Sequence, residues 1–312
     1  MQNCVFLFPG QGAQYVGMGQ EFARTYPSAR AVFQKADEIL GFELSKKIFE
    51  GTEEELKRTE ITQPAVLTTS VAIFTVLKEK GFLPGAVAGL SLGEYSALVC
   101  SEALEFEESL YLVQKRAQYM QEAVPPGRGA MAAVMGLTSE QVHTLCRQGS
   151  LFSHVEPVNY NCPGQIVVAG YKEGVEEVCR LVKESRGRAV MLSVSAPFHS
   201  KLLKPVEEKM EQLLKDVSIK EPKYPFVANE SAKYLKDPQR IRESLIKQVS
   251  SPVLWEDSMK LLLRDGHNLF VEVGPGHTLT GFMKKIDRKT KISPVENLET
   301  FSRFSKLLRE VG

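Results

Sequence analysis

A serine between two glycines is the residue whose setting points most directly to chemistry. Gly89-Leu90-Ser91-Leu92-Gly93 matches the pattern G-x-S-x-G and stands between an apolar run and a helical pattern. Such a pattern forms a sharp strand-to-helix turn, which needs small residues on both sides because the backbones approach closely. The serine is then exposed at a helix N-terminus, where free N–H groups favour a developing oxyanion. We therefore predict that Ser91 is a nucleophile.

A serine nucleophile needs a base, and histidine is the usual one. The chain has five histidines, which are His143, His154, His199, His267 and His277. We expect His143 and His267 at the surface and His154 at a strand edge. His199 ends a segment at a predicted domain junction, where clefts form, and His277 follows the glycine-rich turn 274–276. Both therefore remain candidates for the base.

The acid that would orient the base is missing from its usual place. An ordinary α/β-hydrolase has an acid between the serine and the histidine, but no aspartate occurs between Ser91 and His199. The glutamates in that interval fall mostly in amphipathic helical patterns, and we expect them to be solvated. Either His277 acts with an acid such as Asp257, or a Ser–His dyad has its imidazole held by a neutral acceptor such as a backbone carbonyl.

Arg116 lies at the edge of an apolar stripe on a predicted helix. The stripe consists of Phe106, Leu110, Val113, Ala117 and Met120. In one interpretation the arginine stem covers apolar surface while its head lies in water. In the other, the guanidinium turns inward and pairs with a substrate carboxylate bidentately.

The elements that position these residues follow from apolar patterning. Buried strands are predicted at 4–8 and 85–89, with further strands near 224–229, 269–273 and 292–295. Helices are predicted over 64–80, capped by Gly81, and over 92–101. The longest charge-free apolar stretch, 61–77, contains Gln63, Pro64 and several hydroxyl residues, which favours a buried helix over a membrane span.

The pattern of predicted secondary structure changes after the Pro/Gly-rich segment at 125–129. Strand-like and helical segments follow in the order β-α-β-β-α-β, with a capping box at Thr138 to Gln141. We interpret 127–198 as a small inserted α+β domain and 1–126 with 199–312 as the core. The fold class is therefore predicted to be α/β.

Composition excludes several classes of protein. The 312 residues carry a net charge of +1, with 39 basic and 38 acidic side chains, so nothing indicates binding to nucleic acid or to an anionic membrane. Five scattered cysteines, without a C-x-x-C spacing, indicate neither a disulfide framework nor a zinc site. The first ten residues lack the features of a secretory signal, and a cytoplasmic location is expected.

These residues together resemble the malonyl-CoA:acyl carrier protein transacylase family and, more distantly, the acyltransferase domains of polyketide synthases. The resemblance covers nearly the whole chain. It rests on ordered segments at 8–14, 62–65, 89–98, 114–116, 159–170, 198–199, 248–255 and 272–276.

The resemblance implies an α/β-hydrolase-like core with an inserted ferredoxin-like subdomain. It also implies a role for each matching residue: Ser91 as nucleophile, His199 as base, Gln248 as the residue whose backbone carbonyl orients that histidine, Gln11 and Leu92 as backbone N–H donors of the oxyanion hole, Arg116 as anchor for the malonyl carboxylate, Gln63 as a polar residue lining the site, and Phe198 as a bulky residue that crowds a 2-methyl branch.

The implied reaction is transfer of malonyl from malonyl-CoA to the phosphopantetheine thiol of acyl carrier protein for fatty acid synthesis, through an O-malonyl-serine. No metal or cofactor is implied, and a monomer is expected. Two positions depart from the commonest pattern of the family, namely Leu90, where many members have histidine, and His277, where lysine is frequent. An acidic carrier protein would need a basic patch, for which Lys46, Lys47, Lys201 and Lys204 are candidates, although exposed lysines are usually just solvated.

Three rival functions use the same residues differently. An esterase or thioesterase would pass the acyl group to water. A non-catalytic carrier-binding module would need neither Ser91 nor His199. A transferase for methylmalonyl or acetyl groups would depend less on Arg116.

Overall fold

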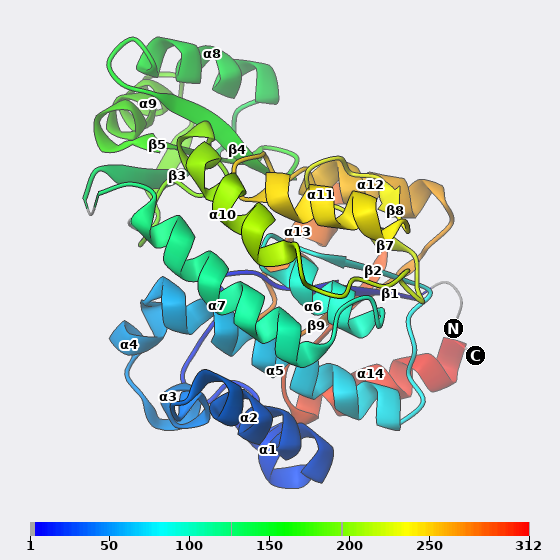
Figure 1. The fold of residues 1–312 in the computed structure, drawn as a ribbon. Helices are drawn as coiled ribbons and strands as arrows, with labels where there is room; N and C mark the ends of the chain where they lie inside the picture. The colour runs from blue at the N-terminus through cyan, green and yellow to red at the C-terminus, as the bar shows by residue number, and fades with distance from the viewer. Residues whose placement is uncertain (1–3, 126, 195, 312) are drawn as a thin grey trace.

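The computed structural model describes residues 4–125, 127–194 and 196–311 (Figure 1). The strands in these residues are β1 (Cys4–Phe8), β2 (Ala86–Gly89), β3 (Gly129–Met135), β4 (Val155–Cys162), β5 (Gln165–Tyr171), β6 (Arg188–Met191), β7 (Phe226–Val227), β8 (Tyr234–Leu235), β9 (Leu269–Val273) and β10 (Lys291–Val295). The helices are α1 (Gln20–Thr25), α2 (Pro27–Leu40), α3 (Leu44–Glu50), α4 (Glu53–Lys57), α5 (Thr59–Glu79), α6 (Gly93–Cys100), α7 (Phe106–Glu122), α8 (Ser139–Gly149), α9 (Lys172–Glu184), the 3₁₀ helix η1 (Lys201–Leu203), α10 (Lys204–Leu214), α11 (Pro238–Gln248), α12 (Trp255–Arg264), α13 (Thr278–Ile286) and α14 (Leu298–Val311).

The larger sheet is mostly parallel and has the strand order β10-β9-β1-β2-β7-β8. Only β8, at one edge, runs antiparallel to its neighbour β7. The strands β1, β2 and β9 are buried along their whole lengths, as expected for a parallel sheet that is covered on both faces. Phe8 pairs with Gly89, and Leu7 pairs with Glu272, so the carboxyl ends of these three strands meet at one edge. The loops that follow them are therefore neighbours.

Helix α5 packs inside the protein. By length and composition alone it could span a membrane, but 83% of its most apolar window is buried within the fold. The predicted burial of 61–77 is confirmed, whereas the predicted start at Pro64 is wrong by five residues. The first turn forms because the N–H groups of Ile61 and Thr62 both donate to the carbonyl of Arg58 at 2.8 Å, and Pro64 is accommodated inside the helix. At the other end Gly81 has the expected left-handed backbone, with φ of 81°.

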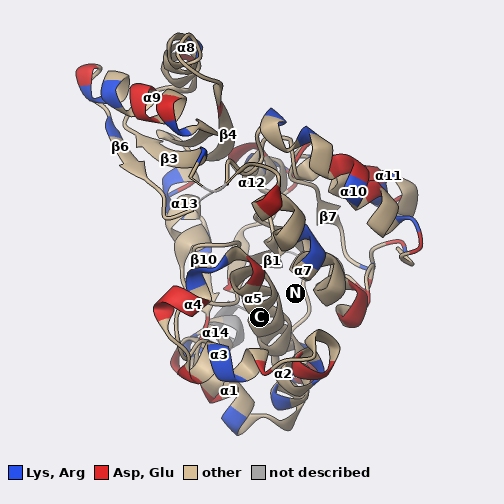
Figure 2. Ribbon diagram, turned by 60° about the vertical axis from the view of Figure 1, so that its left-hand side comes forward, with Lys and Arg blue, Asp and Glu red and all other residues tan. Residues whose placement is uncertain are grey.

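The second sheet is antiparallel, with the strand order β4-β5-β3-β6. Helices α8 and α9 cover its outer face and bury a separate apolar cluster between sheet and helices (Figures 1 and 2). The order β3-α8-β4-β5-α9-β6 is the predicted one, and both hydrogen bonds of the capping box between Thr138 and Gln141 are present. The predicted boundary at 126/127 falls on Pro126, which lies outside the described residues, as does Ser195.

One segment of the chain after α11 is hydrogen-bonded to the second sheet. The N–H of Tyr160 in β4 donates to the carbonyl of Val253 at 2.9 Å, and the N–H of Val253 donates to the carbonyl of Val158 at 2.8 Å. Val253 lies only five residues after Gln248, at the end of α11. The second sheet is therefore hydrogen-bonded to the stretch of core chain that also reaches the site.

The remaining differences from prediction lie at sheet edges. A strand near 224–229 shrinks to the two residues of β7, and its partner β8 has only two residues as well, too few for a periodic pattern. The last strand of the predicted β-α-β-β-α-β order is the four-residue β6, Arg188–Met191, at the edge of the second sheet. Lys and Arg alternate with Asp and Glu along the outer helices, which agrees with the balanced net charge (Figure 2).

Candidate active site

Ser91 occupies a strained backbone corner between β2 and α6. Its φ is 53°, in the left-handed region that a residue other than glycine seldom adopts. A Cβ at position 89 would lie 1.9 Å from the carbonyl oxygen of Gly93, and one at position 93 would lie 2.1 Å from that of Phe8. Both glycines of the pattern are thus required by close backbone contacts, as predicted.

Asn229 holds this corner from behind. Its Oδ1 accepts a hydrogen bond from the N–H of Ser91 at 2.6 Å, and its Nδ2 donates to the carbonyl of Gly89 at 2.7 Å. The side chain is buried, and it bridges the two ends of the turn. The sequence analysis did not identify Asn229. The only signal was its place just after a predicted strand in the core.

His199 is the histidine that the fold brings to Ser91. Its Nε2 lies 2.6 Å from Ser91 Oγ, and its own φ of 63° is also left-handed. His277, the other candidate, is exposed and precedes α13 as its N-cap residue. His143, exposed as expected, lies 2.8 Å from the hydroxyl of Tyr160. His154 lies 3.0 Å from Glu156, and His267 is half-buried.

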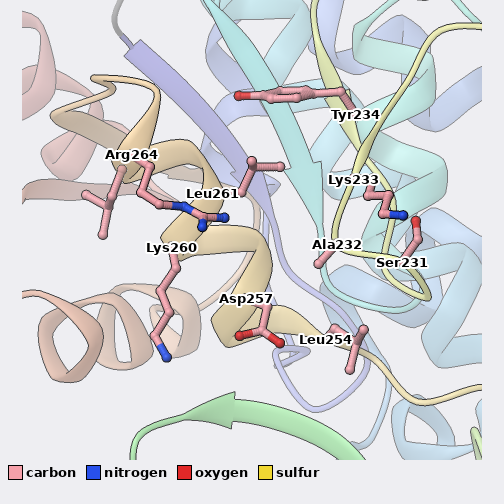
Figure 3. Close-up of a pocket in the computed structure, with 10 residues that line it drawn as sticks. Ser231, Ala232, Lys233, Tyr234, Leu254, Asp257, Lys260, Leu261 and Arg264 are labelled. Carbon is pink, nitrogen blue, oxygen red and sulfur yellow. The ribbon is translucent and has the colours of Figure 1, made fainter.

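A backbone carbonyl is the partner of the second imidazole nitrogen. His199 Nδ1 donates to the carbonyl of Gln248 at 2.8 Å, which leaves Nε2 free to accept the serine proton. Asp257, the acid considered for the alternative, instead lines a separate cavity of about 850 Å³ between α12 and the β7–β8 hairpin (Figure 3). The geometry is therefore that of a dyad with a neutral acceptor.

The imidazole is held in its neutral form. Burial and the nearby charge of Arg116 together lower the pKa of His199 to about 3, although the hydrogen bond to Gln248 opposes the shift. A neutral imidazole with its proton on Nδ1 is the form that can act as a general base toward Ser91.

Arg116 points inward and is completely buried. Its Nη1 donates to Gln63 Oε1 at 2.7 Å, and its Nη2 donates both to Gln248 Oε1 at 2.9 Å and to Ser91 Oγ at 3.2 Å. Its Nε is buried and has no hydrogen-bond partner in the part of the chain that the structure describes. Burial lowers the pKa of this arginine from its usual value, an effect that nearby Tyr95 and Glu94 oppose. The guanidinium thus places positive charge beside the nucleophile.

Glu94 overturns the expectation that the glutamates after Ser91 are solvated. It is completely buried, and it accepts hydrogen bonds from the backbone N–H of Asn229, at 3.2 Å, and from Gln248 Nε2. The same Nε2 donates to the carbonyl of Ser91 at 2.8 Å. Burial raises the pKa of Glu94 to about 8, although its hydrogen bonds oppose this shift. An amphipathic pattern could not reveal this carboxyl, because its partners lie on α11 and in the loop after β7.

The backbone around the predicted oxyanion donors is closely packed. Leu92 is the N-cap residue of α6, where N–H groups lack partners within the helix. Gln11 follows Gly10, at which a Cβ would lie 2.5 Å from the carbonyl oxygen of Leu90. The loops after β1 and β2 therefore meet directly beside Ser91.

A cavity of about 230 Å³ opens onto the nucleophile. Its walls come from the loops after β1 and β2, from helices and from strands of the second sheet, and they include Gln63, Phe198, Asn161 and Met131. Phe282 of α13 lines it as well, and this helix is held by Glu272, whose carboxyl accepts the N–H groups of Leu279 and Thr280 at 3.0 and 2.7 Å. The site therefore lies where the two sheets face each other.

Two further expectations concern charged side chains. Each lysine proposed for a basic patch lies within 4.0 Å of a carboxylate: Lys46 of Glu43, Lys47 of Glu55, Lys201 of Glu156 and Lys204 of Glu207. These pairs reduce the positive charge that the four lysines present. Among the described residues, no group of three or more His, Cys, Asp or Glu side chains could hold a metal ion.

Known proteins are similar to this chain in sequence along nearly its whole length. Residues 5–307 match the acyl transferase domain family. The malonyl CoA-acyl carrier protein transacylase of Bacillus subtilis is 44% identical, over 99% of this chain and 98% of that protein. The transacylase of the same name from Haemophilus influenzae is 40% identical, over 99% of this chain and 100% of that protein.

Solved structures agree with these matches. The transacylase of Clostridium perfringens superposes with a TM-score of 0.95 at 41% identity, covering 99% of this chain and 98% of that one. A malonyl-transacylase in complex with the acyl-carrier protein of a type II polyketide synthase has a TM-score of 0.93 at 39% identity, covering 96% and 97% of the two chains. With identity of this degree over nearly every residue, this protein belongs to the acyl transferase family.

Proposed function

We propose that this protein transfers the malonyl group of malonyl-CoA to the phosphopantetheine thiol of acyl carrier protein, and so supplies extender units for fatty acid synthesis. The observation that carries the proposal is the buried Arg116, which lies 3.2 Å from a serine that is itself 2.6 Å from a neutral histidine. A guanidinium fixed beside the nucleophile can form charge-assisted hydrogen bonds with a carboxylate, so the site suits an acyl group that ends in a carboxylate. The names of the relatives support the same substrates.

In the proposed first half-reaction, Ser91 Oγ attacks the thioester carbonyl of malonyl-CoA while His199 Nε2 accepts its proton. The N–H groups of Gln11 and Leu92 stabilise the oxyanion, each such donor contributing about 3–4 kcal/mol in comparable sites. The carbon–sulfur bond breaks, coenzyme A leaves with the proton returned from His199, and O-malonyl-serine remains. The thiol of the carrier protein then attacks by the reverse route, which predicts ping-pong kinetics.

The other residues have supporting roles in this proposal. The Gln248 carbonyl fixes the imidazole tautomer, and Arg116, supported by Gln63, binds the malonyl carboxylate. Phe198 crowds a branch at the 2-position, although one methyl group changes binding by only about 1–3 kcal/mol.

The proposed architecture is an α/β-hydrolase-like core, residues 1–126 and 199–312, with a ferredoxin-like subdomain at 127–198. The parallel order of the larger sheet and the β-α-β-β-α-β order of the smaller one support it. We further propose a cytoplasmic monomer.

Mass spectrometry after brief exposure to malonyl-CoA tests the proposal. We expect a malonyl adduct on the peptide that contains Ser91, its absence in Ser91→Ala, and its removal by holo acyl carrier protein with formation of malonyl carrier protein. Rapid release of free malonate without the carrier would instead identify a thioesterase. Acylation by acetyl-CoA at an equal rate would contradict the role of Arg116.

A further inference from the structure

Glu94 and the Arg116 guanidinium contact the same amide group. The amide of Gln248 has an NH₂ end, which faces Glu94 and the carbonyl of Ser91, and an oxygen end, which accepts from Arg116 Nη2 at 2.9 Å. The side chains of Glu94, Arg116 and Gln248 are all buried. The remaining partner is the backbone carbonyl of Ser91, at the nucleophile turn. Among the described residues, the amide is thus the hydrogen-bonded bridge between the carboxyl of Glu94 and the guanidinium.

The direction of this amide matters for Arg116. The carbonyl of Ser91 only accepts hydrogen bonds, and the oxygens of Glu94 accept from the backbone N–H of Asn229 and from Gln248 Nε2. Together these acceptors fix the NH₂ end of Gln248 and turn its oxygen toward the guanidinium. If the amide were reversed, its NH₂ group would face the N–H donors of Arg116, and its oxygen would face two acceptors. Each contact would then be lost in a buried setting, where unsatisfied polar groups are costly.

We propose that Glu94 is a positioning residue for acyl-group selection: by fixing the Gln248 amide, it holds Arg116 where the guanidinium can bind the carboxylate of the acyl group. This inference rests on the proposed function. Gln63 holds the other side of the guanidinium at 2.7 Å, but among the described residues it makes no hydrogen bond with Glu94. The raised pKa of Glu94, about 8, agrees with a carboxyl sequestered from water behind the site.

The test is Glu94→Gln, which keeps the shape of the side chain but allows the Gln248 amide to reverse. Rates of acyl-enzyme formation are measured by quenched mass spectrometry with malonyl-CoA and with acetyl-CoA. We expect kcat/KM for malonyl-CoA to fall by about tenfold or more, the effect of one lost hydrogen bond to a charged group. The slow acylation by acetyl-CoA should stay within about twofold, since an acetyl group has no carboxylate for Arg116 to bind.

A double-mutant cycle separates positioning from general support. In an Arg116→Ala background, Glu94→Gln should have little further effect on malonyl transfer, because the group it positions is gone. Gln248→Met, which keeps the backbone carbonyl that holds His199, should lower the ratio of malonyl to acetyl rates and provides the same test if Glu94→Gln does not fold. Glu272→Gln is the matched control: it alters another buried carboxyl, and the ratio of malonyl to acetyl rates should remain that of the wild type.

Two results would overturn the inference. One is an equal fall for both thioesters in Glu94→Gln and in Gln248→Met, and the other is a full effect of Glu94→Gln without Arg116. Either would leave the proposed function intact, provided that the wild type still forms the Ser91 adduct. A wild type without that adduct would overturn the proposed function and this inference together.

Discussion

At the scale of single residues, the site depends on polar groups that the fold keeps away from water. His199 is almost completely buried, yet both of its ring nitrogens have partners, Ser91 and the Gln248 carbonyl. Arg116 is buried and donates to the side-chain amide oxygens of Gln63 and Gln248, and it has no direct carboxylate partner among the described residues. The histidine therefore stays neutral while the arginine keeps its charge, which suits one to proton transfer and the other to anion binding.

The lowered pKa of His199 predicts an unusual pH dependence. The unfolded chain takes up a proton near pH 6.5, but the folded protein does so only near pH 3. Within that window the unfolded state binds more protons, so this group lowers the stability of the fold as the pH falls. Because kcat/KM reports the free enzyme, the acylation rate should stay level through pH 6.5. A rate profile that drops by half near pH 6.5 while the protein remains folded would contradict this.

Asn229→Ala should weaken the nucleophile turn. The substitution removes the acceptor for the N–H of Ser91 and the donor to Gly89, which leaves buried groups unsatisfied at about 1–3 kcal/mol each. We expect a lower free energy of unfolding in urea and slower acylation from both malonyl-CoA and acetyl-CoA. Asn229→Asp is the control, since it can keep the contact to Ser91 but not the one to Gly89, and it should fall between alanine and the wild type.

At the scale of elements, the site is built from loops at the carboxyl ends of β1, β2 and β9. These strands pair in parallel, so the chain leaves each of them at the same edge of the sheet. The helix α6 begins directly after the turn and approaches β1 so closely that Gly93 has no room for a side chain. The position of Ser91 is thus set by the contact between one strand and one helix.

Gly93→Ala should disrupt this contact. Its Cβ would lie 2.1 Å from the carbonyl oxygen of Phe8, a backbone atom that cannot move aside without shifting the buried strand β1. We expect the free energy of unfolding to fall by about 3 kcal/mol, the upper end of what overpacked cores typically lose. Gly281→Ala is the control, because a Cβ at that position of α13 meets nothing within 4 Å. It should be neutral or stabilising by up to about 1 kcal/mol, and equal effects of the two substitutions would contradict the argument.

At the scale of the whole molecule, the site exists only because distant segments converge. Ser91 meets His199 across 108 residues of sequence and Gln248 across 157. The smaller sheet closes the cavity from the other side, and hydrogen bonds between β4 and Val253 connect it to the chain just after Gln248. Substrate binding should therefore affect the stability of the folded protein as a whole.

Malonylation should raise the unfolding temperature. The acyl carboxylate would give the buried Arg116 an opposite charge and an acceptor for its Nε, which has no partner among the described residues. The malonyl-enzyme should therefore unfold roughly 2 °C or more above the unmodified protein. Scanning fluorimetry after removal of excess malonyl-CoA measures the shift. Ser91→Ala should show none, and acetylation should give a smaller shift. An equal shift from both acyl groups would mean that Arg116 does not bind the carboxylate.

The sequence by itself determined the turn at Ser91, the buried strands around it and the capping box at Thr138. These features depend on neighbours within a few residues or on a regular apolar pattern, and both can be recognised in the sequence without knowing the fold. The residue patterns left two candidate bases and two interpretations of Arg116 open. The tertiary structure brought His199 to Ser91, turned Arg116 inward, placed Asp257 in another cavity, and brought Asn229 and Glu94 behind the nucleophile. Those outcomes depend on contacts between residues more than a hundred positions apart and on the burial of polar groups from all sides, which no local pattern encodes.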